Sequence, residues 1–110
     1  MKKTHALILI VGLLFNISKG QNLVPNPSFE DTISCPNLYG QVNKCLFWMN
    51  FGNSPDYFHS CADSGGVTTP YTPFGFQVPR SGNAYCGIIN YSNSVLDSNY
   101  REFLGILLTQ

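Results

Sequence analysis

The alternation of apolar and polar side chains along this chain predicts four β-strands, at residues 22–29, 46–51, 84–91 and 100–108. The last two segments repeat with the two-residue period of a half-buried strand. The second segment holds the densest apolar run after the N-terminal leader, which predicts a strand in the core. In the first segment Pro25 and Pro27 lack backbone donors and favour extended neighbours, so a helix is excluded and an outer edge strand is expected. The pattern therefore predicts an all-β fold.

One short helical turn is expected at residues 55–61, between the second and third predicted strands. Ser54 is a good helix cap, and Pro55 and Asp56 are favoured in a first turn. The single tryptophan, Trp48, lies inside the apolar run. We therefore expect it in the core rather than as a stacking platform for a sugar ring.

Residues 62–81 form a long segment without periodicity, rich in Gly, Thr and Pro. Loops of this length inside a compact domain are usually functional or mobile, and rigid β scaffolds carry binding residues on such loops. We expect a ligand-binding rim made of Tyr71, Phe74, Phe76 and Gln77. The alternative is that these aromatic side chains fold back and cover the edge of the core.

The N-terminus predicts a secretory signal peptide at residues 1–20. Lys2 and Lys3 precede an apolar run at 6–15, and small residues follow at 18 and 20. A membrane-spanning helix needs about 20 apolar residues, roughly twice this run, so an uncleaved anchor is the weaker alternative. The mature chain is expected to begin at Gln21, without a transmembrane segment, and to be secreted or associated with the cell surface or outer membrane.

Charge and composition narrow the class of partner. Three of the six basic residues lie in the leader and all six acidic residues lie after it, so residues 21–110 carry an excess of three negative charges. A nucleic-acid partner is therefore not expected. Few charges, many aromatic residues and many Gly, Pro, Ser and Asn residues are typical of a turn-rich β protein.

All four cysteines follow the leader, and an even number in an exported chain predicts disulfides. Four cysteines allow three connectivities, of which we favour Cys35 with Cys61 and Cys45 with Cys86. A zinc site is disfavoured because there is no C-x-x-C pair and a single histidine, His59, remains after the leader. Catalysis by His59 is also disfavoured, since adjacent residues of one turn cannot converge as a triad.

Several motifs resemble, in order and spacing, the N-terminal galactose-binding-like jelly-roll domain of a group of exported bacterial surface proteins. They are N-L-V-P-N-P-S-F-E-D (22–31), S-C-P (34–36), Trp48, S-P-D-Y-F-H-S-C (54–61), F-G-F-Q (74–77), R-S-G-N-A-Y-C-G-I (80–88) and Y-R-E-F-L (100–104). The resemblance covers nearly all of 21–110. Such sandwich domains include many carbohydrate-binding modules, and longer members of the group carry an OmpA-like peptidoglycan-binding domain or a type IX secretion sorting tail.

The resemblance also implies a structural calcium ion. In related carbohydrate-binding modules a glutamate at the end of the first strand ligates calcium, and Glu30, with Asp31 beside it, matches that position. The second carboxylate of the pattern is not matched, and calcium takes six to eight oxygens, so a solvated strand end is the alternative for both residues. Cys45 and Cys86 stand where the group more commonly has small residues, which supports a bridge between them.

These observations predict a non-catalytic extracellular or cell-surface module that binds a carbohydrate or glycan. The alternative is a structural or adhesive interaction domain of the cell envelope without a small-molecule ligand. A jelly roll needs about eight strands, and four are predicted, so we expect a sandwich that is incomplete at its C-terminal side and a missing downstream domain. Residues 21–110 alone are expected to be oligomeric or molten.

Overall fold

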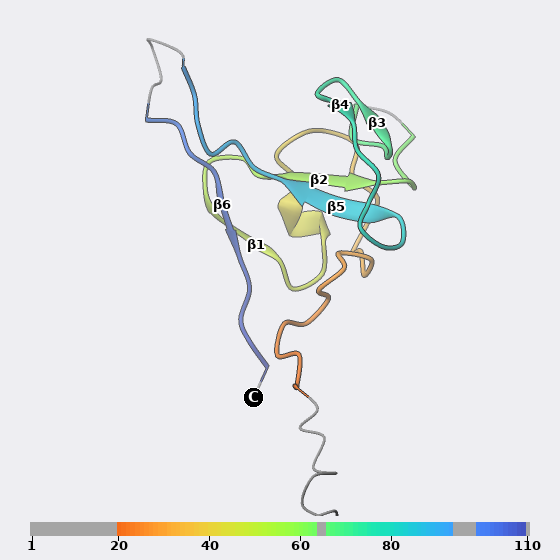
Figure 1. Ribbon diagram of the computed structural model, residues 1–110, viewed down its shortest axis with the longest axis vertical. Helices are drawn as coiled ribbons and strands as arrows, with labels where there is room; N and C mark the ends of the chain where they lie inside the picture. The colour runs from red at the N-terminus through yellow and green to blue at the C-terminus, as the bar shows by residue number, and fades with distance from the viewer. Residues whose placement is uncertain (1–19, 64–65, 94–98, 110) are drawn as a thin grey trace, which may run out of the picture.

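The computed structural model describes residues 20–63, 66–93 and 99–109, and the predicted signal peptide falls outside these ranges except for its last residue. The described chain consists of short antiparallel strands and one turn of 3-10 helix, which confirms the all-β class (Figure 1). In chain order the elements are η1 (Val42–Lys44), β1 (Met49–Gly52), β2 (Asp56–His59), β3 (Tyr71–Thr72), β4 (Gly75–Phe76), β5 (Ala84–Gly87) and β6 (Phe103–Gly105).

The six strands pair as three antiparallel ribbons, β1 with β6, β2 with β5, and β3 with β4. In Figure 1 the β2–β5 ribbon lies in the middle of the described chain. The β3–β4 hairpin lies to one side of it, and the β1–β6 ribbon runs along the other.

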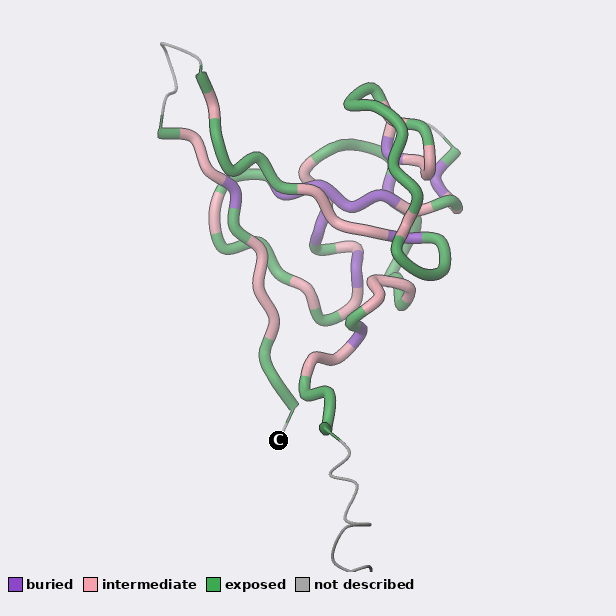
Figure 2. Tube along the Cα trace, in the orientation of Figure 1, coloured by how far each residue is buried: buried purple, intermediate pink, exposed green. Residues whose placement is uncertain are grey.

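The β2–β5 ribbon carries core side chains on both of its faces. Successive side chains of a strand point to opposite faces, so Tyr57 and Phe58 of β2 belong to separate clusters. Tyr57 packs with Cys45, and Phe58 packs with Val67. Burial of one such side chain contributes about 1.5–3 kcal/mol. Figure 2 shows most of β2 as buried, with His59 at its end half-buried.

The predicted helical turn at 55–61 is wrong, because Asp56–His59 forms β2. Ser54 does not cap a helix. Its Oγ lies 2.7 Å from the hydroxyl of Tyr100 and donates to Glu102 Oε1 at 3.0 Å. The segment is paired with β5 and buried on both sides by residues distant in sequence. Long-range pairing and burial outweigh a local helix signal of this kind.

The predicted edge strand at 22–29 is also wrong, because the chain turns there. The Phe29 N–H donates to the Asn26 carbonyl at 3.2 Å, and both residues have positive φ, 64° and 47°. Pro27 is the second residue of this turn, where its fixed φ is favoured. Trp48, which was expected in the core, is half-buried and packs against the core cluster and on this turn. Its ring lies 4.6 Å from the Phe29 ring, and its Nε1 donates to the Asn26 carbonyl at 3.0 Å.

The remaining three predicted strands are present but shorter than expected. Segment 46–51 overlaps β1, and segments 84–91 and 100–108 contain β5 and β6 respectively. The expectation that β1 is a core strand is wrong, since Met49 and Phe51 are both exposed. An apolar run alone does not decide burial when no second layer covers the strand.

One of the two predicted disulfides is present. The Cys35–Cys61 bridge spans a separation of 26 residues and ties the segment before η1 to the residues just after β2. Cys45 and Cys86 are free thiols, so the predicted second bridge is not formed in this structure. The two side chains pack together, and their hydrogen bond is the largest cause of a lowered pKa at Cys45 and a raised pKa at Cys86. Asn26 Nδ2 also donates to Cys45 Sγ at 3.3 Å. The Cys45 sulfur therefore takes part in hydrogen bonds and not in a disulfide.

Candidate functional site

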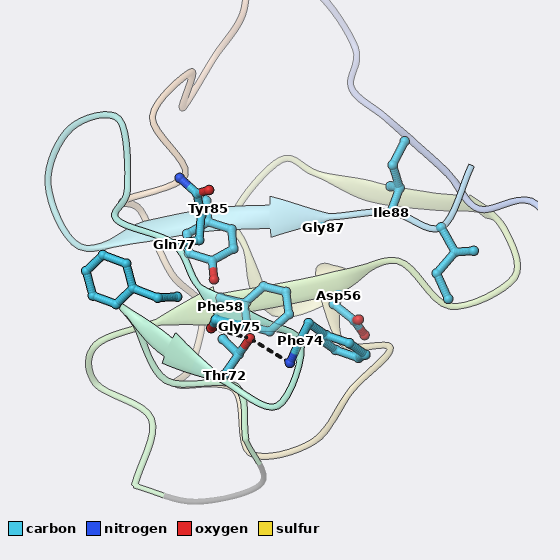
Figure 3. Close-up of a pocket in the computed structure, with 11 residues that line it drawn as sticks. Asp56, Phe58, Thr72, Phe74, Gly75, Gln77, Tyr85, Gly87 and Ile88 are labelled. Carbon is cyan, nitrogen blue, oxygen red and sulfur yellow. Dashed lines mark hydrogen bonds between the residues drawn. The ribbon is translucent and has the colours of Figure 1, made fainter. Parts of the chain in front are cut away.

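A pocket of about 390 Å³ lies between the β3–β4 hairpin and the β2–β5 ribbon (Figure 3). Its volume is within the range of small-molecule sites. It is open to solvent on the hairpin side, where the lining side chains are exposed. The lining residues are Asp56, Phe58, Thr72, Phe74, Gly75, Phe76, Gln77, Tyr85, Gly87, Ile88 and Ile89.

The floor of the pocket is built by a cross-strand aromatic pair. Phe58 of β2 stands opposite Tyr85 of β5, and their rings stack with centroids 4.9 Å apart and planes 22° apart. Phe74 of the hairpin meets Phe58 edge to face, at 6.4 Å and 88°. Offset and edge-to-face arrangements are the favourable geometries for such rings. The floor is therefore fixed by the ribbon, and the hairpin is docked on it through an aromatic contact.

The β3–β4 hairpin forms one wall of the pocket, and a two-residue turn connects its strands. Thr72 and Gly75 pair across the hairpin, Thr72 Oγ1 accepts the Phe74 N–H at 3.2 Å, and the same hydroxyl donates to the Gly75 carbonyl at 3.2 Å. Gly75 has a φ of 130°, a conformation that side-chain-bearing residues rarely adopt. The turn leaves Phe74 and Phe76 exposed, by 69% and 61% respectively.

Asp56 is the carboxyl group of the pocket lining, and it is almost wholly buried. Its Oδ1 accepts the Gly40 N–H at 2.7 Å. Burial raises the pKa of this carboxyl, and the nearby charge of Glu102 raises it further, while the Gly40 hydrogen bond opposes the shift. Burial likewise raises the pKa of the Tyr85 phenol. The lining contains no lysine, arginine or histidine.

The structure brings together three of the four side chains predicted to bind ligand. Phe74, Phe76 and Gln77 line the pocket. Tyr71 does not line it, and its ring lies 5.0 Å from that of Phe76.

Asp56, Phe58 and Tyr85 also line the pocket and were not among the predicted ligand-binding residues. Tyr85, Ile89 and Tyr91 occupy alternate positions of the predicted strand 84–91 and so share one face, which is a signal for Tyr85. Asp56 and Phe58 fall in the predicted helical turn at 55–61. A helical turn there does not predict that this segment pairs with β5.

The two predicted calcium ligands have other contacts. Glu30 Oε1 accepts the backbone N–H groups of Asn83 at 2.7 Å and Ala84 at 2.9 Å, which fixes the start of β5. Gly82 permits this approach, since a Cβ there would stand 2.4 Å from the Glu30 carboxyl carbon. Asp31 accepts the Leu46 N–H through its backbone carbonyl at 2.8 Å. Within the described residues no group of three or more metal-ligating side chains occurs, and calcium binding by Glu30 and Asp31 stays a prediction.

Comparison with known proteins identifies no relative: no family model, no curated protein and no solved structure matches this chain. Over the part of the chain that the structure describes, no helix has the length and apolar character needed to cross a bilayer. The Cys35–Cys61 disulfide is typical of an oxidising, extracytoplasmic compartment.

Proposed function

We propose that this protein is a non-catalytic, extracellular or cell-surface binding module that holds a carbohydrate or glycan in the pocket between the β3–β4 hairpin and the β2–β5 ribbon. One observation carries the proposal: the exposed residues Phe74, Phe76 and Gln77, which the sequence suggested as a ligand rim, line a single pocket over an aromatic floor.

The chemistry of the lining suits a sugar. Aromatic faces pack against the C–H face of a pyranose ring, and Phe74 and Phe76 are exposed enough to offer such faces. Gln77 supplies an amide with both donors and acceptors, and Thr72 supplies a hydroxyl. A few polar groups among apolar walls are the usual composition of a small-ligand site.

The same lining favours binding over catalysis. Its side chains do not pair a nucleophile with a general base, the arrangement that covalent or hydrolytic chemistry needs. His59 is not in the lining, and its Nδ1 accepts the Cys61 N–H at 3.0 Å in a local structural contact.

The wider setting belongs to the same proposal. The motif series from 22–31 to 100–104 resembles a galactose-binding-like jelly-roll domain of exported surface proteins, and the disulfide fits export through the signal peptide at 1–20. Attachment to the cell surface would then be provided by another domain or partner of the envelope.

The test is an array of immobilised polysaccharides and glycans probed with the exported, oxidised protein. We expect retention on a restricted set of glycans and release by the matching soluble oligosaccharide. Retention on none of them would contradict the proposal.

A second candidate, an adhesive domain without a small ligand, is favoured by a different observation. The β1–β6 ribbon and its flanks expose Phe51, Phe103 and Leu107, and apolar side chains gathered on one element often mark a protein contact. Binding to envelope proteins in the absence of any glycan retention would select this candidate.

A further inference from the structure

We propose that the pocket prefers a positively charged ligand, a sugar that carries a free amino group, and that Asp56 is the specificity-determining residue. This inference rests on the proposed function, because it names the class of glycan that the same pocket would take.

The lining of the pocket carries a negative charge. Asp56 brings a carboxylate to a pocket whose lining contains no basic side chain. Among the described residues, its hydrogen-bond donor is the Gly40 backbone N–H at Oδ1. The carboxylate is thus fixed in place by a neutral partner, and its charge is not neutralised by a cation of the lining.

Burial of the ionised Asp56 carboxyl is unfavourable in free energy. Asp56 is 9% exposed as a residue, and burial is the main cause of the raised pKa of its carboxyl, because a buried carboxylate loses hydration. The negative charge of Glu102 adds to this cost. A cation bound beside Asp56 would offset both effects, because an opposite charge favours the ionised form.

The aromatic rings of the pocket also favour a cation. Ring faces carry negative electrostatic potential, and a cation within about 6 Å of a ring centroid is attracted to it. Phe58 and Tyr85 form the floor, and Figure 3 shows Asp56 on the same side of the pocket as Phe74. An ammonium group placed there would meet a carboxylate and aromatic faces together.

A free amine on a sugar matches this combination better than a neutral substituent. It offers three N–H donors and a positive charge to Asp56, and the ring to which it is attached can pack on Phe74 or Phe76. An N-acetylated sugar has the same ring but offers a neutral amide. The pocket should therefore distinguish two sugars that differ only in whether this nitrogen is a free amine or is acetylated.

The experiment uses two probes with one backbone, an oligomer of glucosamine and the corresponding oligomer of N-acetylglucosamine, titrated against the exported protein at about pH 6. We expect the glucosamine oligomer to bind at least tenfold more tightly. Equal binding of both oligomers, or tighter binding of the N-acetylated one, would overturn this inference and leave glycan binding intact. Binding of neither, with no retention on the array, would contradict the proposed function itself.

The variant that isolates the role of Asp56 is Asp56→Asn, which keeps an oxygen to accept the Gly40 N–H. It should lose about tenfold of its affinity for the glucosamine oligomer and little for the N-acetylated one, so that the preference disappears. The matched control is Asp63→Asn, which removes the same charge at an exposed position outside the pocket and should keep the native preference. An Asp56→Asn variant that retains the preference would overturn the assignment.

A competition measurement on the native protein keeps the assignment testable if Asp56→Asn does not fold. Tetramethylammonium chloride should displace the glucosamine oligomer at lower concentration than sodium chloride at equal ionic strength, because aromatic faces attract the organic cation. Equal displacement by the two salts would show that the pocket does not recognise a cation.

Discussion

The β2–β5 and β1–β6 ribbons have the same architecture and opposite burial. Each is a two-stranded antiparallel pair, yet β2 is buried along most of its length while β1 is mostly exposed. A two-stranded ribbon alone is marginally stable in water. The difference therefore lies in what covers each ribbon.

Three contacts from distant parts of the chain cover or fix the β2–β5 ribbon. Val67 and Cys45 lie in the clusters on its two sides, and the carboxylate of Glu30 holds the start of β5. The Cys35–Cys61 bridge then ties the end of β2 to the chain before η1. The pocket is built on the ribbon that is fixed best.

Polar contacts near its ends hold the β1–β6 ribbon. Glu102, which is buried, accepts the Ile89 N–H through Oε2 at 2.7 Å and the Tyr100 hydroxyl through Oε1 at 2.9 Å. The Thr109 N–H donates to the Leu23 carbonyl at 2.9 Å. Such contacts position the ribbon without burying its apolar side chains.

The largest expected effect compares one aromatic side chain from each ribbon. Tyr57→Ala removes a fully buried ring and its hydrogen bond to the Phe29 carbonyl, so we expect a loss of about 3–5 kcal/mol in the free energy of unfolding. Phe51→Ala, at a side chain that is 65% exposed, should change it by less than about 0.5 kcal/mol. Urea denaturation measures both. Equal losses would show that the ribbons are equally buried in solution.

The disulfide should have the next largest effect. Replacing Cys35 and Cys61 together by serine opens a loop of 26 residues, and the chain-entropy relation gives a loss of about 3.5 kcal/mol. Replacing Cys45 and Cys86 together should leave unchanged the extra alkylation of the denatured protein that reduction produces, because these two free thiols are alkylated without reductant. Peptide mapping without reductant checks the pairing, and a Cys45–Cys86 crosslink would contradict the structure.

Loss of the Glu30 contact should lower the free energy of unfolding by less than loss of the disulfide. A comparison with Asp31 distinguishes this structural role of Glu30 from calcium binding. Glu30→Ala removes the acceptor of the Asn83 and Ala84 N–H groups and should cost about 1–3 kcal/mol. Asp31→Ala, the adjacent carboxylate, should cost less than about 0.5 kcal/mol. Thermal melting with calcium and with a chelator provides the contrast. If both residues hold calcium, both variants would lose a calcium-dependent rise in melting temperature.

The smallest effect concerns the pH dependence of Asp56. A carboxyl whose pKa is raised on folding favours the folded state at low pH, and that contribution is lost as the pH rises through the raised pKa. Asp56→Asn should therefore raise the melting temperature slightly at neutral pH, and the difference should vanish below the ordinary range of an aspartate. A lower melting temperature at neutral pH would show that the ionised carboxylate stabilises the fold.

Local signals in the sequence predicted the all-β class and three of the side chains that line the pocket. The aromatic residues of 71–77 and the alternation of 84–91 were enough to suggest a binding rim and a strand. The hairpin itself was missed, although Pro73 followed by Gly75 is a turn signal. Its strands are two residues each, too short for periodicity to show.

The errors arose where a distant contact decides the structure. Ser54 and Pro55 would begin a helix, but pairing with β5 makes the segment a strand. Asn26 replaces strand pairing with its own side chain, which donates to the Leu46 carbonyl at 3.0 Å and accepts the Asp31 N–H at 3.0 Å. Neither contact leaves a pattern in the residues around it.

The measurement that tests the central claim most directly is a titration of native, Phe74→Ala and Phe51→Ala proteins with the soluble form of the glycan that retains the native protein most strongly. Both side chains are exposed, so both variants should fold. Phe74→Ala also removes the contact with Phe58 that docks the hairpin, so urea denaturation of each variant accompanies the titration. We predict about a tenfold loss of affinity, roughly 1.4 kcal/mol, for Phe74→Ala and no change for Phe51→Ala. Unchanged binding by Phe74→Ala, or loss confined to Phe51→Ala, would place the site elsewhere and contradict the account.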